Sequence, residues 1–262
     1  MPLLVTFAVK AESRPFERLI GTNPELRVVL TGIGQRNAER AIRKALAGQS
    51  PRLVLTCGFA GGLNPELAVG TVVFSADEDP GSRRGNEAEL LARSQVPPPY
   101  VSGYDPAAII SSLSLALLAS SARPAKFHRA EKVAATAEEK RALRLSTGAD
   151  AVEMESGIIR AICRDNEILS ATVRVISDAA NEDLPLDFNS LMDADQNLSY
   201  GRLTAALLRS PGKIGALLKL QKQTQAAAEK LAQVLAKFIS NQTQAQSWPA
   251  LPPDGASFSR CS

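Results

Sequence analysis

Val152-Glu153-Met154-Glu155 and Arg174-Val175-Ile176-Ser177-Asp178 are the two segments that decide how this sequence is interpreted. Counting from Glu155, isoleucines recur at the spacing of one helix face, at Ile158, Ile159 and Ile162. A carboxylate on that core-facing stripe is costly unless a partner binds it. Asp178 ends an apolar run, and open α/β sheets handle ligands at the carboxyl ends of buried strands. Each acid alone is typical of an ordinary helix start or strand-end turn, but together they predict a binding site.

Short β-rich runs alternate with helical patterns along the chain. The predicted strands are Leu3–Phe7, Arg27–Thr31, Leu53–Cys57, Thr71–Phe74 and Thr172–Ile176, and the predicted helices are Gln35–Ala47, Ala107–Ser120, Glu138–Leu145 and Glu155–Asn166. This alternation indicates a single α/β domain with a mainly parallel, twisted central sheet flanked by helices. Gly32 and Gly34 lack the third glycine of a dinucleotide fingerprint, so they predict a tight strand-to-helix turn close to a ligand.

The composition is that of an ordinary globular protein. The 262 residues are 45% hydrophobic and 22% charged, with a net charge of +3 that is too small to indicate nucleic acid. No apolar stretch approaches the roughly 20 residues needed to span a bilayer. The N-terminus lacks signal-peptide features, and Cys57, Cys163 and Cys261 form no disulfide framework, so we expect a cytoplasmic protein. His128 is the only histidine, which disfavours serine–histidine chemistry or a histidine-rich metal site, and we expect no metal.

Five ordered segments carry a family resemblance. They are Phe7-Ala8-Val9-Lys10-Ala11-Glu12, Thr31-Gly32-Ile33-Gly34, Gly58-Phe59-Ala60-Gly61-Gly62 followed by Val69-Gly70-Thr71-Val72-Val73, and the two segments quoted first. Together they resemble the purine nucleoside phosphorylase and methylthioadenosine/S-adenosylhomocysteine nucleosidase superfamily, whose members cleave the N-glycosidic bond of nucleosides. The resemblance implies a nucleoside phosphorylase-like fold and a small-molecule nucleoside substrate. It also implies a homodimer or larger homo-oligomer and no cofactor, with inorganic phosphate as co-substrate in a phosphorylase.

The resemblance also implies roles for individual residues. Asp178 would serve the leaving base near purine N7 and the 6-substituent, Glu155 would bind the ribose hydroxyls, and Met154 would pack beneath the sugar. Glu12 matches the carboxylate that activates water in the nucleosidase branch. The other expected substrate-binding residues are Glu153, Ser177, Gly61, Phe59 and Val133. The implied activity is hydrolysis of a purine nucleoside, with adenine as the favoured base and methylthioadenosine or S-adenosylhomocysteine as examples.

Two departures keep other activities open. Phe59 stands where the nucleosidases usually have a small hydroxyl residue, and Lys10 stands where they are acidic. Lys10 and Arg174 could bind phosphate, so phosphorolysis is an alternative. The segment Lys132–Lys140 also resembles the hopanoid-associated phosphorylases, which act on an adenosyl-lipid. A non-catalytic nucleoside-binding protein is a second alternative.

The remaining segments complete the predicted organisation. We expect the domain to cover residues 1–240 and a disordered tail to cover residues 241–262, and the Pro-, Gly- and charge-rich residues 77–104 predict a loop or lid. Leu198–Ile239 is predicted to be helical apart from a break at Ser210-Pro211-Gly212. The lysines of the last helix are typical of a surface helix packed on the domain, and weak contact with a membrane surface is the alternative.

Overall fold

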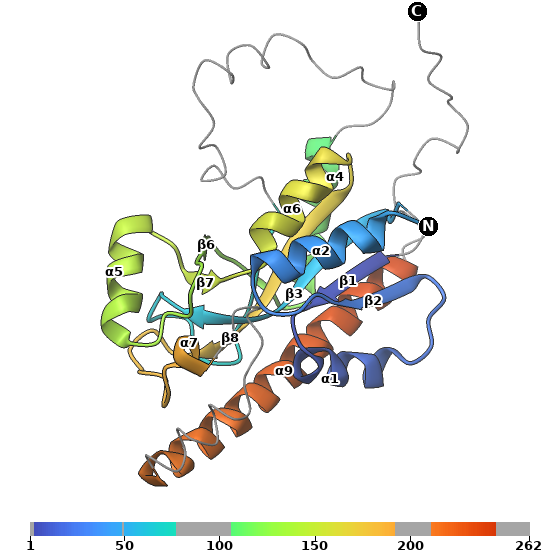
Figure 1. The fold of residues 1–262 in the computed structure, drawn as a ribbon. Helices are drawn as coiled ribbons and strands as arrows, with labels where there is room; N and C mark the ends of the chain where they lie inside the picture. Colours follow the sequence, from blue (N-terminus) through green and yellow to red (C-terminus); the bar gives the residue numbers. More distant parts are fainter. Residues whose placement is uncertain (1–2, 49, 77–105, 192–210, 245–262) are drawn as a thin grey trace, which may run out of the picture.

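The computed structural model describes residues 3–48, 50–76, 106–191 and 211–244 (Figure 1). The strands are β1 (Leu3–Phe7), β2 (Leu26–Leu30), β3 (Leu53–Gly62), β4 (Val72–Ser75), β5 (Arg123–Pro124), β6 (Phe127–Arg129), β7 (Ala151–Glu153) and β8 (Leu169–Asp178). The helices are α1 (Lys10–Ile20), α2 (Gln35–Leu46), α4 (Pro106–Ala119), α5 (Ala137–Thr147), α6 (Ser156–Asp165), α7 (Phe188–Leu191) and α9 (Ile214–Gln244), with a 3₁₀ turn at Pro211–Lys213.

The strands form one eight-stranded sheet in the order β2-β1-β3-β8-β4-β5, with β7 paired to β3 and β6 paired to β7. The central pairs β1–β2, β1–β3 and β3–β8 are parallel. β4 pairs antiparallel with β8, and β7 pairs antiparallel with the end of β3. The prediction of an α/β domain with a mainly parallel central sheet flanked by helices is therefore confirmed.

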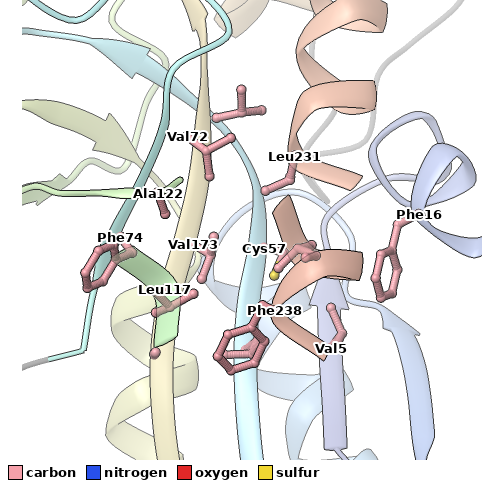
Figure 2. Packing of buried hydrophobic residues seen from close by; sticks show 14 of the residues in the cluster. Val5, Phe16, Cys57, Val72, Phe74, Leu117, Ala122, Val173, Leu231 and Phe238 are labelled. Atoms are coloured by element: carbon pink, nitrogen blue, oxygen red, sulfur yellow. The ribbon is translucent and has the colours of Figure 1, made fainter. Parts of the chain in front are cut away.

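Helices cover both faces of the sheet because the central strands are apolar on both sides. On one face, α1, α4 and α9 cover the cluster that contains Phe16, Cys57, Val173, Leu231 and Phe238 (Figure 2). On the other face, α2 and α6 pack against β1 and β3 through a second cluster. Burying one such large apolar side chain fully contributes roughly 1.5–3 kcal/mol, so these two layers hold the central strands firmly in place.

Several elements differ from the sequence prediction. No helix was predicted directly after the first strand, but Glu12 lies in the first turn of α1. The sequence interpretation missed this helix because Pro15 lies inside it, and proline normally ends a helical pattern. The strand predicted for Thr172–Ile176 extends over Leu169–Asp178, and the short strands β5, β6 and β7 were not predicted.

The C-terminal segments are described only in part. The break predicted at Ser210-Pro211-Gly212 precedes α9, and α9 continues to Gln244, four residues past the predicted end of the domain. The loop or lid predicted for residues 77–104 and the remainder of the predicted tail lie outside the described residues. None of the helices in the described ranges is both long and apolar enough to cross a membrane.

Candidate active site

The predicted site residues gather at the carboxyl ends of the parallel strands. Glu12 follows β1, the Gly32–Gly34 turn follows β2, and Asp178 ends β8. The last five residues of β3, Gly58–Gly62, run between these groups. Open α/β sheets bind ligands at this edge, so the topology brings together segments that are far apart in the sequence. In Figure 1 the small elements β6, β7, α5 and α7 lie at the same end of the sheet.

Glu12 is buried and holds three backbone N–H groups. Its Oε2 accepts from Ala8 at 2.9 Å and from Val9 at 3.1 Å, and its Oε1 accepts from Phe59 at 2.8 Å. Burial raises the pKa of Glu12, while the Arg174 guanidinium and these N–H groups oppose that rise. Oε1 accepts a single hydrogen bond and keeps a second lone pair, so Glu12 can still accept a proton from a bound water molecule.

Arg174 is completely buried among carboxylates. Its Nη2 lies 2.6 Å from Glu153 Oε2 and 3.4 Å from Glu155 Oε2, and its Nη1 donates to the Cys57 carbonyl at 3.0 Å. Burial lowers the pKa of Arg174, but the attraction of Glu153, Glu155 and Glu12 outweighs that effect and raises it. Because Glu153 and Glu155 already engage the guanidinium, a phosphate ion at Arg174 would have to compete with carboxylates. The phosphate-binding role of Arg174 therefore remains a prediction that these contacts disfavour.

Glu153 connects Arg174 to the start of α6. Its carboxylate accepts hydrogen bonds from the Glu155 and Ser156 backbone N–H groups at 3.0 and 2.7 Å, and from the Ser156 hydroxyl at 2.7 Å. These contacts satisfy N–H groups that the first turn of a helix leaves unpaired. The substrate-binding role of Glu153 stays a prediction, because the hydrogen bonds described for its carboxylate are all made to groups of the protein itself.

Glu155 is the N-cap residue of α6, one position before the helix on which the sequence pattern placed it. Its Oε1 accepts the Gly34 backbone N–H at 2.9 Å. Gly32 and Gly34 have positive φ angles of 80° and 82°, which form the predicted tight turn and aim this N–H at the carboxylate. Burial raises the pKa of Glu155 to about 7, with Arg174 opposing the rise and Glu153 adding to it.

The raised pKa of Glu155 predicts a loss of stability as the pH rises. A carboxyl whose pKa is raised on folding stabilises the protein below its unfolded pKa of 4.5, and this contribution disappears as the pH passes through about 7. The corresponding loss is about 3 kcal/mol. We expect the urea-derived free energy of unfolding to fall less steeply between pH 5 and pH 8 in Glu155→Gln than in the wild type. Glu66→Gln, which changes an exposed carboxylate, should keep the wild-type slope, and equal slopes in all three proteins would contradict the assignment.

Gly58 is required where Glu12 and Arg174 approach β3. A Cβ atom at this position would lie 2.6 Å from Arg174 Nη1 and 2.7 Å from Glu12 Oε1, and its φ is +142°. We expect Gly58→Ala to lower the free energy of unfolding by roughly 2–4 kcal/mol, because it strains the backbone and displaces both charged groups. The matched control is Gly215→Ala in α9, where no atom lies within 4 Å of the added Cβ. Urea denaturation measures both, and equal stability of the two variants would refute the prediction.

Ser177 and Asp178 form the second part of the site. The Ser177 hydroxyl donates to Asp178 Oδ1 at 2.6 Å and lies 3.2 Å from the Ala60 carbonyl. A Cβ on Gly61 would lie 3.3 Å from Asp178 Oδ2, so Gly61 leaves room beside this carboxylate. Lys140 Nζ lies 2.5 Å from the same Oδ2. The segment Gly58–Gly62 therefore connects the Glu12–Arg174 cluster to Asp178.

The other predicted substrate-binding residues, Phe59, Met154 and Val133, differ in their contacts. Phe59 contributes its N–H to Glu12, and its half-buried ring packs against the core. Met154 is half-buried between Glu153 and Glu155. The backbone of Val133 is held by the Asn189 side chain through two hydrogen bonds of 2.8 and 2.9 Å.

Lys10 is exposed and pairs with Glu17 at 2.5 Å in the same helix. No described contact links Lys10 to the carboxylates of the site, so its phosphate-binding role also stays a prediction. Glu12, two residues further along α1 and on its buried side, does reach the site.

Sequence reasoning missed three groups at the site. Lys140 was not singled out because it lies in a helix rich in exposed Glu, Lys and Arg, where nothing marks one lysine as buried. The role of Gly58 depends on a close approach between distant segments, and the Gly34 N–H is a backbone group. The only signal in the sequence for the last two was the clustering of glycines at predicted strand ends.

Comparison with known proteins shows the family and the fold of this chain. A sequence model of the phosphorylase superfamily matches residues 5–240. A 5′-methylthioadenosine/S-adenosylhomocysteine nucleosidase of Shewanella sediminis is 26% identical over 178 residues, which is 63% of this chain and 73% of that protein.

Two solved structures share the fold. The futalosine hydrolase of Helicobacter pylori has a TM-score of 0.58 and 17% identity over 92% of this chain and 98% of its own. The 5′-methylthioadenosine/S-adenosylhomocysteine nucleosidase of Neisseria meningitidis, in complex with methylthio-immucillin-A, has a TM-score of 0.59 and 18% identity over 92% and 99%.

The chain belongs to the phosphorylase superfamily. The family resemblance stated from five short segments is therefore confirmed. So is the expectation of an enzyme of the nucleosidase or nucleoside phosphorylase kind, because the sequence relative is a nucleosidase.

Proposed function

We propose that this protein hydrolyses the N-glycosidic bond of a purine nucleoside, with adenine as the base and methylthioadenosine or S-adenosylhomocysteine as candidate substrates. The observation that carries the proposal is the excess of carboxyl groups over cations in the buried cluster. Glu12, Glu153 and Glu155 all interact with the Arg174 guanidinium, so carboxylates outnumber it three to one.

This charge balance suits the chemistry of glycosidic cleavage. As the bond to the purine breaks, the ribosyl group becomes cation-like, and a preorganised carboxylate beside it lowers the barrier. The same carboxylates repel an incoming phosphate ion, whereas a neutral water molecule pays no such cost. Glu12 supports water as the nucleophile, because a buried carboxylate with a free lone pair on Oε1 can remove a proton from that water.

Glu155 supports binding of the ribose. Two carboxylate oxygens match a vicinal diol, and the Gly34 N–H and Arg174 orient this side chain. With a pKa raised to about 7, Glu155 is partly neutral at neutral pH and gains charge as the pH rises. A cationic ribosyl mimic would bind more tightly as Glu155 ionises.

Asp178 supports the choice of base. Its carboxyl group can deliver a proton to the purine ring and can accept a hydrogen bond from a 6-amino group, which favours adenine. Ser177 orients Oδ1, while Oδ2 is buried beside Gly61 and pairs with Lys140. The names of the sequence relative and of the N. meningitidis structure point to the same substrate class.

The test is release of free base from a panel of nucleosides: methylthioadenosine, S-adenosylhomocysteine, adenosine and futalosine. Each reaction is run with and without inorganic phosphate, and the sugar product is identified. We expect phosphate-independent release of adenine with a free sugar as the other product. Appearance of ribose-1-phosphate or its 5′-substituted form would overturn hydrolysis in favour of phosphorolysis. Binding without turnover of any substrate would leave only a nucleoside-binding protein.

A further inference from the structure

Lys140 is a completely buried lysine whose role the proposed reaction does not yet explain. It lies in α5, and its Nζ is 2.5 Å from Asp178 Oδ2. The same Nζ donates to the Ala179 carbonyl at 2.8 Å and to the Glu182 carbonyl at 2.9 Å. Lysine is almost never fully buried unless it is paired, so this ammonium group is held in place by the segment that carries Asp178.

The surroundings of Lys140 keep this contact rigid. Thr136 and Glu139 form a capping box that fixes the start of α5. The Asp183 carboxylate accepts the Ala137 N–H at 2.7 Å, and the Leu184 N–H donates to the Ala135 carbonyl at 2.7 Å. The Glu182 carboxylate points to the exposed Lys219, 3.5 Å away, and leaves Asp178 as the carboxylate paired with Lys140 in the described residues.

From this geometry we infer that Lys140 is a positioning residue for the general acid. It orients Asp178 and stabilises the carboxylate that Asp178 becomes when it gives up its proton. This inference rests on the proposed function, because it assumes that Asp178 protonates the leaving base.

The proton balance of the step is simple. The Asp178 O–H bond breaks as an N–H bond forms on the purine, and the electron pair of the glycosidic bond passes to the base. Asp178 is left as a carboxylate, while water bonds to the sugar through its oxygen and gives one proton to Glu12. Proton exchange with solvent then restores the Asp178 acid and the Glu12 base. An ammonium 2.5 Å from Asp178 Oδ2 attracts the negative charge that forms there, so it favours the proton-transfer step. Lys140 itself contacts the acid and acts through it.

The test compares two leaving groups in Lys140→Met. One substrate is the preferred adenine nucleoside, and the other is a 4-nitrophenyl riboside with the same 5′ substituent, whose leaving group departs without a proton. We expect kcat for the nucleoside to fall about 10–100-fold, a part of the roughly 10²–10⁴-fold that general acid catalysis contributes. KM should change less than about 3-fold, and the nitrophenyl substrate should keep most of its rate. Lys140→Arg, which keeps the positive charge, should recover part of the loss.

Lys219→Met is the matched control, because it removes an exposed lysine that contacts the same loop. It should keep the wild-type kcat for both substrates. If Lys140 served only the fold, its loss would slow both substrates equally, and that result would overturn the inference. A Lys140→Met protein with wild-type kcat would do the same.

Lys140→Met could unfold the protein, because it leaves the Asp178 carboxylate buried without its partner. A second comparison therefore uses proteins in which Asp178 is replaced by a neutral residue. Asp178→Asn is compared with the double variant Asp178→Asn/Lys140→Met, both checked by circular dichroism. If Lys140 acts through Asp178, the second change should alter kcat less than about 2-fold, and a further loss of about 10-fold or more would refute the inference. A wild type that releases no base from any nucleoside would refute the proposed function instead, which separates the two failures.

Discussion

Asp178→Asn is expected to lower kcat for the nucleoside by roughly 10²–10⁴-fold, the range that general acid catalysis typically contributes. An asparagine keeps the shape of the side chain and can still hydrogen-bond to the base, but it cannot deliver a proton. It also leaves the Lys140 ammonium without its carboxylate, so activity must be compared per folded molecule. Steady-state kinetics on a sample checked by circular dichroism measures this effect.

The matched control is Asp150→Asn. Asp150 is also ion-paired, with Arg144 at 3.0 Å, and it also accepts a backbone N–H, from Lys126. Its loss should affect stability and leave kcat close to the wild-type value. If Asp178→Asn retained near-wild-type kcat, Asp178 would have to be removed from the acid role.

Glu12→Gln is expected to reduce turnover by a similar factor while the affinity for free adenine changes little. The amide cannot take a proton from water. Its NH₂ group would also face a backbone N–H that now donates a hydrogen bond to Glu12. Because burial raises the pKa of Glu12 above 4.5, the acid limb of the wild-type pH–rate profile should lie above that value. The limb should disappear in the variant, since a base must be ionised to act.

Glu17→Gln is the control for this change, since Glu17 lies in the same helix and pairs with the exposed Lys10. It should leave turnover unchanged. A second variant, Glu12→Ala, should regain part of its activity when formate is added, because a small carboxylate can occupy the vacated space and accept the proton. A phosphate-dependent wild type with an active Glu12→Gln variant would overturn water as the nucleophile and leave the family assignment in place.

Much of the fold could be predicted because its signals are local. The strands at Leu3–Phe7 and Leu53–Cys57 are mostly apolar runs, and the helix predicted at Gln35–Ala47 has the period of a buried face. The same reasoning failed for α1. Pro15 is typical of a helix end, but this helix is stabilised by the buried side chains of Phe16 and Glu12. It also missed β5, β6 and β7, which have two or three residues each and depend on their partner strands.

The candidate site was predicted in part for a similar reason. A carboxylate at Glu155 in an apolar helix pattern required a partner, and the structure supplies the Gly34 N–H and Arg174. The sequence could not predict that Gly34 would be a partner of Glu155, because the two residues are 121 positions apart. Arg174, which was predicted as a possible phosphate ligand, pairs with the Glu153 carboxylate in the structure.

By itself, the sequence determined the parallel sheet, the strand ends at which the acidic residues lie, and the superfamily. These depend on hydrophobic periodicity and on short motifs, both of which are local properties. Only the tertiary structure decided the environment of each charge: that Glu12 and Lys140 are buried, and that Lys140 rather than Arg174 is the cation beside Asp178. The physical reason is that burial and ion pairing are set by segments brought together across the sheet, and desolvation and Coulomb attraction act only once those segments meet.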